Sequence, residues 1–391
     1  MYIRSIKEIK DVKGRRVLVR VDFNVPLENG KVKDDFKIKK TLPTIQYLIK
    51  KGAKVILVSH LGRPKGVDTK LSLQPVVEHL EKLLKQLVAF VKIGRLQDWK
   101  IVGRAIEKLK NGELAMLENI RFVKGEEDND PNVAKALAAL ADIFVSDCFA
   151  VAHRDAASIT GVAKYLPHFA GLLLFEEVSV LSRAMEKPKR PLVVLLGGAK
   201  VETKIPIVRH LLQKADYILV GGEIANTYWW AKGSTVGQSL VGKDFKADIL
   251  KYCKNKKVVL PVDCVVGAPQ GGDVRVFSAL SPMAVPNDHG MYDIGPQTVE
   301  LFSTYLKKAG TILWNGAMGK FEVRPYEKGT FALMKLLGKT KAFSIVGGGE
   351  SVEILKKCGI INKINLVSTG GGAMLEFLGG KKLPGIEALK K

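Results

Sequence analysis

The segment Leu192–Lys204 combines residue types that could bind a phosphate group. Its apolar start, Leu192–Leu196, is typical of a buried strand, and Gly197-Gly198 and a helical pattern follow. Lys200 and Lys204 stand four residues apart, so on a helix they share one face near its N-terminus. Unpaired backbone N–H groups, a positive helix end and two ammonium groups favour an anion, most often phosphate. We therefore predict a phosphate site here.

Anion-binding side chains also follow predicted strands in the first half of the chain. Ligands of an open parallel sheet bind beyond the carboxyl ends of its strands, so these side chains would meet at one edge. Each could be a capping or surface residue by itself. Several such strand ends in succession favour a site for a small anion, because arginine matches phosphate and carboxylate geometry. The side chains are Asp22, Asn24, His60, Arg63, Arg121, His153 and Arg154.

Glycines follow most of the predicted strands of the second half. Glycine lets the backbone approach a ligand closely, which suits a nucleotide lying across the sheet, although tight turns would use glycine too. The glycine-containing strand ends are Gly197-Gly198, Gly221-Gly222, Asn315-Gly316, Gly347–Gly349 and Gly370–Gly372. A half that gathers arginines for a small anion and a half that gathers glycines for a nucleotide indicate phosphoryl transfer across a cleft.

The elements that would position these residues alternate between apolar runs and helical patterns. Most of the apolar runs lack strict alternation, as expected for strands covered on both faces, and 391 residues favour two domains. We predict an α/β protein of two doubly wound parallel-sheet (Rossmann-like) domains, joined by a helix over Leu173–Met185. The predicted strands are Val17–Phe23, Val55–Val58, Leu114–Leu117, Ile143–Val145, Leu192–Leu196, Tyr217–Val220, Val258–Leu260, Thr311–Trp314, Phe343–Val346 and Ile364–Val367. The predicted helices include Thr41–Lys51, Gln74–Lys85, Val133–Ala141, Lys204–Lys214 and Ser351–Cys358.

Composition and missing motifs argue against several other classes. No apolar run approaches the roughly 20 residues that span a bilayer, and the charged start of the sequence lacks a signal-peptide core, so we expect a cytoplasmic protein. The four cysteines form no CxxC pair, which argues against zinc and disulfides. There is no GxGxxG, and Gly338-Lys339-Thr340 lacks the first glycine of a Walker A loop. The net charge of +23 comes from lysines spread along the chain, which favours a generally basic surface.

Motifs in both halves resemble those of the phosphoglycerate kinases, in the same order and over the whole length. The first half carries Arg20–Pro26 (RVDFNVP), Ser59–Pro64 (SHLGRP), Leu117–Phe122 (LENIRF) and Ala152–Arg154 (AHR). The second half carries Gly197–Lys204, Asp293–Thr298, Trp314–Glu322, Gly347–Gly349 and Ser368–Ala373. The resemblance implies reversible phosphoryl transfer between 1,3-bisphosphoglycerate and ADP, giving 3-phosphoglycerate and ATP, in a monomer that closes by hinge bending and uses Mg²⁺.

The resemblance also implies roles for individual residues. Those implied to bind 3-phosphoglycerate are Asp22, Phe23, Asn24, Lys37, His60, Leu61, Gly62, Arg63, Arg121 and Arg154. Those implied to bind the nucleotide are Gly198, Ala199, Lys200, Lys204, Gly222, Met291, Asn315, Glu322, Gly347, Gly348, Gly349, Glu350 and Ser351. Lys37, Lys200, Gly348 and Gly371 would act on the transferred phosphoryl group, and Glu350 would contact the metal. The implied domains are residues 1–172 and 188–374, with an interdomain helix at 173–187 and a tail at 375–391 that returns to the first domain.

Some positions depart from the family pattern. Lys37 replaces an arginine, so the charge is kept but the bidentate fork is lost, and we expect activity that is retained but slowed. Glu350 replaces an aspartate, which could shift the metal preference because Mg²⁺ demands strict octahedral geometry. Ala156 replaces a histidine. Met291-Tyr292 replaces a smaller Gly-Leu pair beside the base, which leaves the base preference open.

Two other functions stay open at this point. The chain could be a divergent, weakly active nucleotide-binding protein of the same fold, although the retained Lys200, Lys204, Arg63, Arg121 and Arg154 argue against it. It could also be a basic protein that binds nucleic acid. That function would require an affinity that falls steeply with salt, and we expect no specific nucleic-acid partner.

Overall fold

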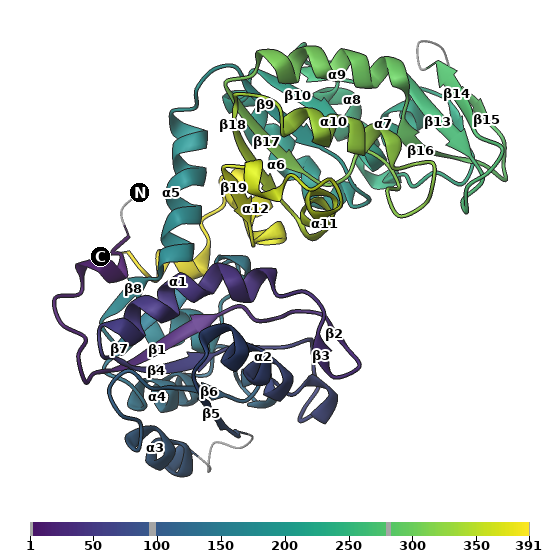
Figure 1. Cartoon of the computed structure of the whole chain (residues 1–391). Helices are drawn as coiled ribbons and strands as arrows, with labels where there is room; N and C mark the ends of the chain where they lie inside the picture. The colour runs from purple at the N-terminus through teal and green to yellow at the C-terminus, as the bar shows by residue number, and fades with distance from the viewer. Residues whose placement is uncertain (1–2, 94–98, 279–282, 391) are drawn as a thin grey trace. The chain divides into compact units, whose positions relative to one another are not determined.

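The computed structural model describes residues 3–93, 99–278 and 283–390, which divide into two compact units (Figure 1). The first unit runs to Ser179 and includes the segment from Lys382 onward, and the second spans Val180–Lys381. The outer limits of the implied domains, residues 1 and 391, lie outside the described residues. Within the described ranges, no helix is long and apolar enough to cross a membrane.

The first unit is built on a six-stranded parallel sheet with the order β5-β6-β4-β1-β7-β8. Its strands are β1 (Arg16–Val21), β4 (Lys54–Val58), β5 (Val88–Val91), β6 (Leu114–Leu117), β7 (Ile143–Asp147) and β8 (His168–Ala170). Its helices are α1 (Phe36–Lys50), α2 (Gln74–Leu84), α3 (Trp99–Glu107), α4 (Pro131–Ala139), α13 (Pro384–Glu387) and the start of α5 (Leu172–Glu186). A short hairpin joins β2 (Leu27–Glu28) to β3 (Lys31–Val32).

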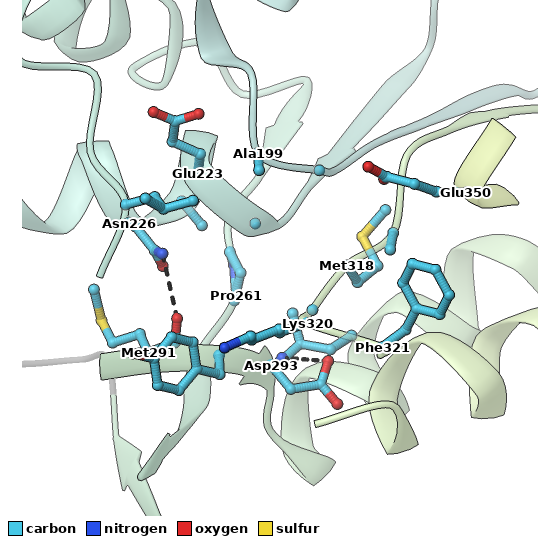
Figure 2. Close-up of a pocket in the computed structure, with 18 of the residues that line it drawn as sticks. Ala199, Glu223, Asn226, Pro261, Met291, Asp293, Met318, Lys320, Phe321 and Glu350 are labelled. Atoms are coloured by element: carbon cyan, nitrogen blue, oxygen red, sulfur yellow. Dashed lines mark hydrogen bonds between the residues drawn. The ribbon is translucent and has the colours of Figure 1, made fainter. Parts of the chain in front are cut away.

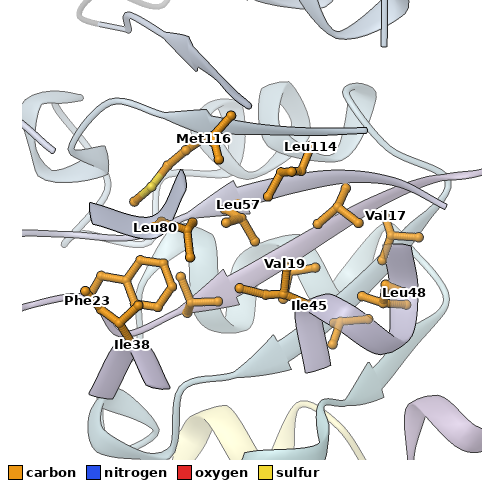
Figure 3. Packing of buried hydrophobic residues seen from close by; sticks show 14 of the residues in the cluster. Val17, Val19, Phe23, Ile38, Ile45, Leu48, Leu57, Leu80, Leu114 and Met116 are labelled. Atoms are coloured by element: carbon orange, nitrogen blue, oxygen red, sulfur yellow. The ribbon is translucent and has the colours of Figure 1, made fainter. Parts of the chain in front are cut away.

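The core of this unit explains why the sequence of β1 is mostly apolar. All residues of β1 after Arg16 are buried, as expected for a central strand with both faces covered. Val17 and Val19 pack with Ile45 and Leu48 of α1 (Figure 3). Arg20 is the one charged residue that is buried in this strand. A buried charged side chain needs hydrogen-bonding partners.

The second unit contains another six-stranded parallel sheet, with the order β12-β10-β9-β17-β18-β19. Its strands are β9 (Leu192–Leu196), β10 (Tyr217–Val220), β12 (Val258–Val259), β17 (Thr311–Asn315), β18 (Phe343–Gly347) and β19 (Leu366–Ser368). The helices are α6 (Val201–Lys214), α7 (Gly222–Ala231), α8 (Lys246–Tyr252), α9 (Pro296–Lys308), α10 (Lys328–Leu337), α11 (Gly349–Lys357) and α12 (Gly371–Leu378). The two parallel sheets confirm the predicted doubly wound fold class.

An antiparallel sheet in the second unit was not predicted. It has the order β14-β13-β16 and consists of β13 (Asp263–Gly267), β14 (Arg275–Ser278) and β16 (Gly290–Ile294). A parallel pair, β11 (Thr235–Val236) and β15 (Ala284–Val285), shares one apolar cluster with residues of β13 and β16. The β14 strand is mostly exposed, and the register between β13 and β16 shifts, so no long apolar run marks these strands.

Each predicted strand and helix has a counterpart whose ends differ by a few residues. The largest difference is at α1, which begins at Phe36 rather than at Thr41. Asp34 accepts a hydrogen bond from the Phe36 N–H at 2.9 Å, so the acidic residues before the apolar pattern already start the helix.

A buried carboxyl group links β7 to α5. Asp147 is fully buried at the end of β7, and its Oδ1 accepts a hydrogen bond from the Leu174 N–H at 3.0 Å. Burial raises the pKa of Asp147 to about 7, although hydrogen bonds from Thr44 and from backbone amides oppose the shift. The folded protein therefore holds a proton on this group more tightly than the unfolded chain does, and ionisation of Asp147 costs stability.

We predict that Asp147→Asn changes the pH dependence of unfolding. Relative to the variant, the wild type should lose roughly 2–4 kcal/mol of unfolding free energy as the pH rises from about 4 through about 7. Urea unfolding at several pH values measures the difference. Asp142→Asn is the control, because the hydrogen bond from Arg16 lowers the pKa of Asp142 and moves its titration below this window. A wild-type-to-Asp147→Asn difference that is independent of pH would contradict the prediction.

Candidate active site

Asp22 and Lys37 form an ion pair beyond the end of β1. The Lys37 ammonium, on the first turn of α1, lies 2.7 Å from Asp22 Oδ2, and Asp22 Oδ1 accepts the Asn24 N–H at 3.1 Å. Burial alone would raise the pKa of Asp22, but the charge of Lys37 and the hydrogen bonds from Lys37 and the Asn24 N–H outweigh it, so the pKa is lowered. The buried Asp22 carboxylate therefore holds Lys37 beside other residues that are predicted to bind the substrate.

His60, beyond the end of β4, is buried and neutral. Burial lowers its pKa well below the usual value, an effect that Asp22 opposes and Arg20 and Arg121 reinforce. Its Nδ1 lies 3.3 Å from Arg20 Nη2, and arginine can only donate, so Nδ1 accepts and Nε2 carries the proton. His60 can therefore offer a substrate a hydrogen bond but not a positive charge.

Arg20 is a site residue that sequence reasoning did not identify. It is 2% exposed, and its Nε donates to Ser158 Oγ at 2.8 Å while Nη1 donates to the Val21 carbonyl oxygen. Together with the contact to His60, these bonds tie the ends of β1 and β4 to the turn Ala157–Gly161. The feature of the sequence that could have identified Arg20 is its position inside a strand that is otherwise apolar.

The arginines predicted for the anion differ in their surroundings. Arg121 Nη1 donates to the Gly62 carbonyl oxygen, and Nη2 lies 2.9 Å from Glu127. Arg154 Nη1 lies 3.2 Å from the same carboxylate, and Arg63 is exposed. Burial lowers the pKa of the Arg121 guanidinium, an effect that Glu127 opposes.

Three of the predicted substrate residues shape the loops that carry the others. Phe23 is buried in the core, and the Leu61 carbonyl oxygen accepts a hydrogen bond from Asn119 at 2.7 Å. Gly62 has a φ of +63° and donates its N–H to Asn24 Oδ1 at 3.0 Å. A Cβ at Gly62 would lie 2.8 Å from a methyl carbon of Leu71, a side chain that can shift, so the positive φ is the main reason for glycine here.

The second unit brings helix N-termini to one cavity of about 640 Å³. The residues before α6, α11 and α12, namely Lys200, Gly348 and Gly370, make no side-chain capping bond. At α6 the Val201 N–H donates to Glu223 Oε2 at 2.9 Å, so this donor is already paired. A helix N-terminus without a cap keeps backbone N–H donors and a partial positive charge for an anion. The residues around the cavity include Ala199, Lys200, Lys204, Asn315, Gly348, Gly349, Glu350, Gly371 and Gly372.

Close packing of glycines and a buried lysine shapes this cavity. Gly348 has φ +102° and ψ 139°, a conformation essentially restricted to glycine, and a Cβ on Gly371 would lie 3.3 Å from the Gly348 Cα. Gly198 has a φ of +88°, and a Cβ there would lie 3.2 Å from Lys204 Nζ. Burial lowers the pKa of the Lys204 ammonium, while Glu350 and Glu223 oppose the shift.

A second cavity, of about 450 Å³, has apolar walls and a few polar groups (Figure 2). The Asn226 amide donates to the Met291 carbonyl oxygen at 3.3 Å, and the Lys320 ammonium donates to the Pro269 carbonyl oxygen at 2.6 Å and lies 5.0 Å from the centre of the Tyr292 ring. Its lining includes Gly198, Ala199, Gly222, Asn226, Trp229, Met291, Tyr292, Lys320, Phe321, Glu322 and Glu350. Because Ala199 and Glu350 line both cavities, one ligand with an apolar ring and a charged tail could occupy the two.

Two predicted nucleotide residues lie behind the cavity walls. Ser351 is fully buried, and its Oγ accepts a hydrogen bond from the Gly316 N–H at 3.0 Å. The Gly347 carbonyl oxygen accepts a hydrogen bond from the Asn315 amide at 3.0 Å. In contrast, Lys320 and Asn226 line the apolar cavity although sequence reasoning gave them no role, and Tyr292, placed beside the base by the resemblance, lines it too. Lys320 lies within the motif Trp314–Glu322, and this was the one feature of the sequence that pointed to it.

Comparison with known proteins identifies the family. The family model described as phosphoglycerate kinase matches residues 6–381. The chain belongs to the phosphoglycerate kinase family. A phosphoglycerate kinase of Pelotomaculum thermopropionicum is 44% identical, covering 100% of this chain and 99% of the relative. A phosphoglycerate kinase of Dictyoglomus turgidum is 45% identical, with 97% of each covered. The solved phosphoglycerate kinase of Coxiella burnetii superposes with a TM-score of 0.87 at 39% identity, with 99% of each chain covered.

These findings confirm the phosphoglycerate kinase resemblance inferred from the motifs, and with it the class of enzyme. The roles of the individual side chains stay predictions. The phosphoglycerate kinase motifs of the first half contribute to one group, around Asp22, His60 and Arg121. Those at Lys200, Gly348 and Gly371 line one cavity in the second unit.

We predict that Gly348→Ala destabilises the protein. An alanine must adopt the same backbone conformation, and its Cβ would lie 3.3 Å from the Asn315 amide nitrogen. The expected loss in unfolding free energy is about 1–3 kcal/mol, measured by chemical denaturation. Gly349→Ala is the matched control, since a Cβ there meets nothing within 4 Å and alanine favours a helix. Equal losses for the two variants would contradict a conformational requirement at Gly348.

Proposed function

We propose that the chain catalyses reversible phosphoryl transfer between 1,3-bisphosphoglycerate and ADP, giving 3-phosphoglycerate and ATP. The observation that carries the proposal is the cavity in the second unit where the starts of α6, α11 and α12 meet Lys200 and Lys204. An adjoining apolar cavity supports it, because a nucleotide combines a base with a polyphosphate.

The first unit binds 3-phosphoglycerate in this proposal. Arg63, Arg121 and Arg154 supply guanidinium groups, and His60 supplies the Nε2 proton. Lys37 adds an ammonium group beside Asp22. These groups suit a ligand that carries a phosphate and a carboxylate.

The second unit binds the nucleotide. Lys200 and Lys204 contact the phosphates, together with the backbone N–H groups of Gly348, Gly349 and Gly371 at helix starts. Met291, Gly222 and Ala199 lie against the base and sugar, and Glu322 accepts hydrogen bonds from the ribose hydroxyls. The contacts of Glu322 and Met291 follow from the apolar cavity that both residues line.

Phosphoryl transfer needs no nucleophile from the protein. A carboxylate oxygen of 3-phosphoglycerate forms a bond to the γ-phosphorus of ATP, and the bond from that phosphorus to the β,γ-bridging oxygen breaks, leaving the electron pair on ADP. Lys37, Lys200 and the glycine N–H groups offset charge on the transferred group. The two ligands must meet in line without water, so we propose that the two units close during turnover.

The residues present fit a magnesium–nucleotide complex. Glu350, on the first turn of α11, lines both cavities and offers the hard oxygen donor that Mg²⁺ prefers. Magnesium usually takes one or two carboxylates and completes its shell with phosphate oxygens and water. Among the described residues, no group of three or more His, Cys, Asp or Glu side chains could hold a metal ion, so Glu350 would hold the metal together with the nucleotide. When bound, the ion neutralises phosphate charge.

We further propose a cytoplasmic monomer without a nucleic-acid partner. All four cysteines are free, which suits a reducing compartment. Lys37, Arg121 and Lys204 lie beside carboxylates, so we assign the +23 charge to the wider surface rather than to a basic groove at these sites.

We predict ATP consumption that depends on 3-phosphoglycerate, and faster turnover for Lys37→Arg. The arginine restores a bidentate donor and should raise kcat by roughly two- to tenfold in a coupled assay. Lys39→Arg is the control, because Lys39 lies on the same helix but is paired with Asp35 at 3.0 Å. No ATP consumption by wild type or Lys37→Arg would favour the weakly active binding protein. An unchanged or lower rate for Lys37→Arg alone would refute only the role given to Lys37.

A further inference from the structure

One glutamate bridges two of the arginines in the first unit. Glu127 Oε1 lies 2.9 Å from Arg121 Nη2 and 3.2 Å from Arg154 Nη1. Both arginines are predicted to bind 3-phosphoglycerate. The Arg121 side chain is only 5% exposed, so it needs a compensating anion or hydrogen-bond acceptors. Glu127 supplies that anion within the protein itself.

Glu127 differs from the other carboxylates beside these cations. The Asp22 side chain is 7% exposed and accepts a backbone N–H as well as the Lys37 ammonium. Glu126 is also buried and accepts the Ser158 N–H at 3.0 Å, which anchors the loop. The Glu127 side chain is 53% exposed, so water can solvate its carboxylate once it leaves the arginines. Because Arg121 is buried, the departure has a small cost only when another anion takes the place of Glu127.

Glu127 and the two arginines line one small cavity, of about 30 Å³. The Glu127 carboxylate already contacts one Nη atom of each guanidinium group. A phosphate that binds both guanidinium groups would therefore compete with Glu127. Arg154 also has an unused hydrogen-bond donor, because its Nε is buried and has no partner among the described residues.

We propose that Glu127 is an exchangeable internal counter-ion that sets the affinity of the first unit for 3-phosphoglycerate. The substrate phosphate takes the place of the Glu127 carboxylate on Arg121 and Arg154. A phosphate near neutral pH carries up to two negative charges and three acceptor oxygens, so it gains more from two guanidinium groups than a carboxylate does. A singly charged carboxylate would replace Glu127 without that gain. Glu127 thereby favours ligands with a phosphate over ligands with only carboxylates. The inference rests on the proposed function of this site.

Glu127→Gln tests the exchange, because it keeps the shape and removes the charge. Titration calorimetry with 3-phosphoglycerate alone should give an affinity about two- to fivefold higher than that of the wild type. Added salt should reduce the difference, since screening weakens an exposed pair. Glu353→Gln is the matched control: it makes the same charge change at an exposed pair with Lys357, on α11 of the second unit, and should leave the affinity unchanged.

The outcomes separate this inference from the proposed function. If the wild type binds 3-phosphoglycerate and Glu127→Gln binds it equally well or more weakly, the counter-ion role is overturned and the proposed function stands. If the wild type does not bind 3-phosphoglycerate, both are overturned. Glu127→Asp keeps the charge on a shorter side chain, so an affinity gain for Glu127→Gln that Glu127→Asp matches in full would also overturn the role of charge. Thermal unfolding of each variant checks that it is folded.

Discussion

All strands of a parallel sheet end at the same edge, and the helices that follow begin there with backbone N–H groups that lack intrahelical partners. In the second unit this polarity gathers the starts of α6, α11 and α12 at one cavity. The Gly348 conformation and the close approach of Gly371 then depend on the absence of side chains. In the first unit the same polarity gathers Asp22, His60 and Arg121 beyond β1, β4 and β6.

Cations gathered at a sheet edge repel one another and lose water, so each needs a carboxylate nearby. Lys37 lies against Asp22, and Glu127 bridges Arg121 and a second arginine. Lys204 interacts with Glu350 and with a second glutamate. These carboxylates offset part of the positive charge of the sites, and the whole chain carries a net charge of +23. A ligand binds by exchanging with these internal partners or by joining them.

The sequence predicted the parallel sheets well, because strands covered on both faces appear as continuous apolar runs such as β9. It did not predict the antiparallel sheet, whose edge strand β14 is exposed and lacks such a run. Motifs placed the site residues in order along the chain, but tertiary packing decides their partners. Arg20 and Glu127 were missed for this reason, since only the fold brings one to His60 and the other to Arg121.

The division of two ligands between two units is tested most directly by hydrogen exchange with each ligand alone. 3-Phosphoglycerate should slow exchange in peptides covering 20–26, 59–64 and 118–123, while Mg-ADP should slow it in peptides covering 198–204, 347–352 and 370–374. Slower exchange of the glycine-rich segments with 3-phosphoglycerate, and no change in the first unit, would contradict the assignment of the anion site to the arginines.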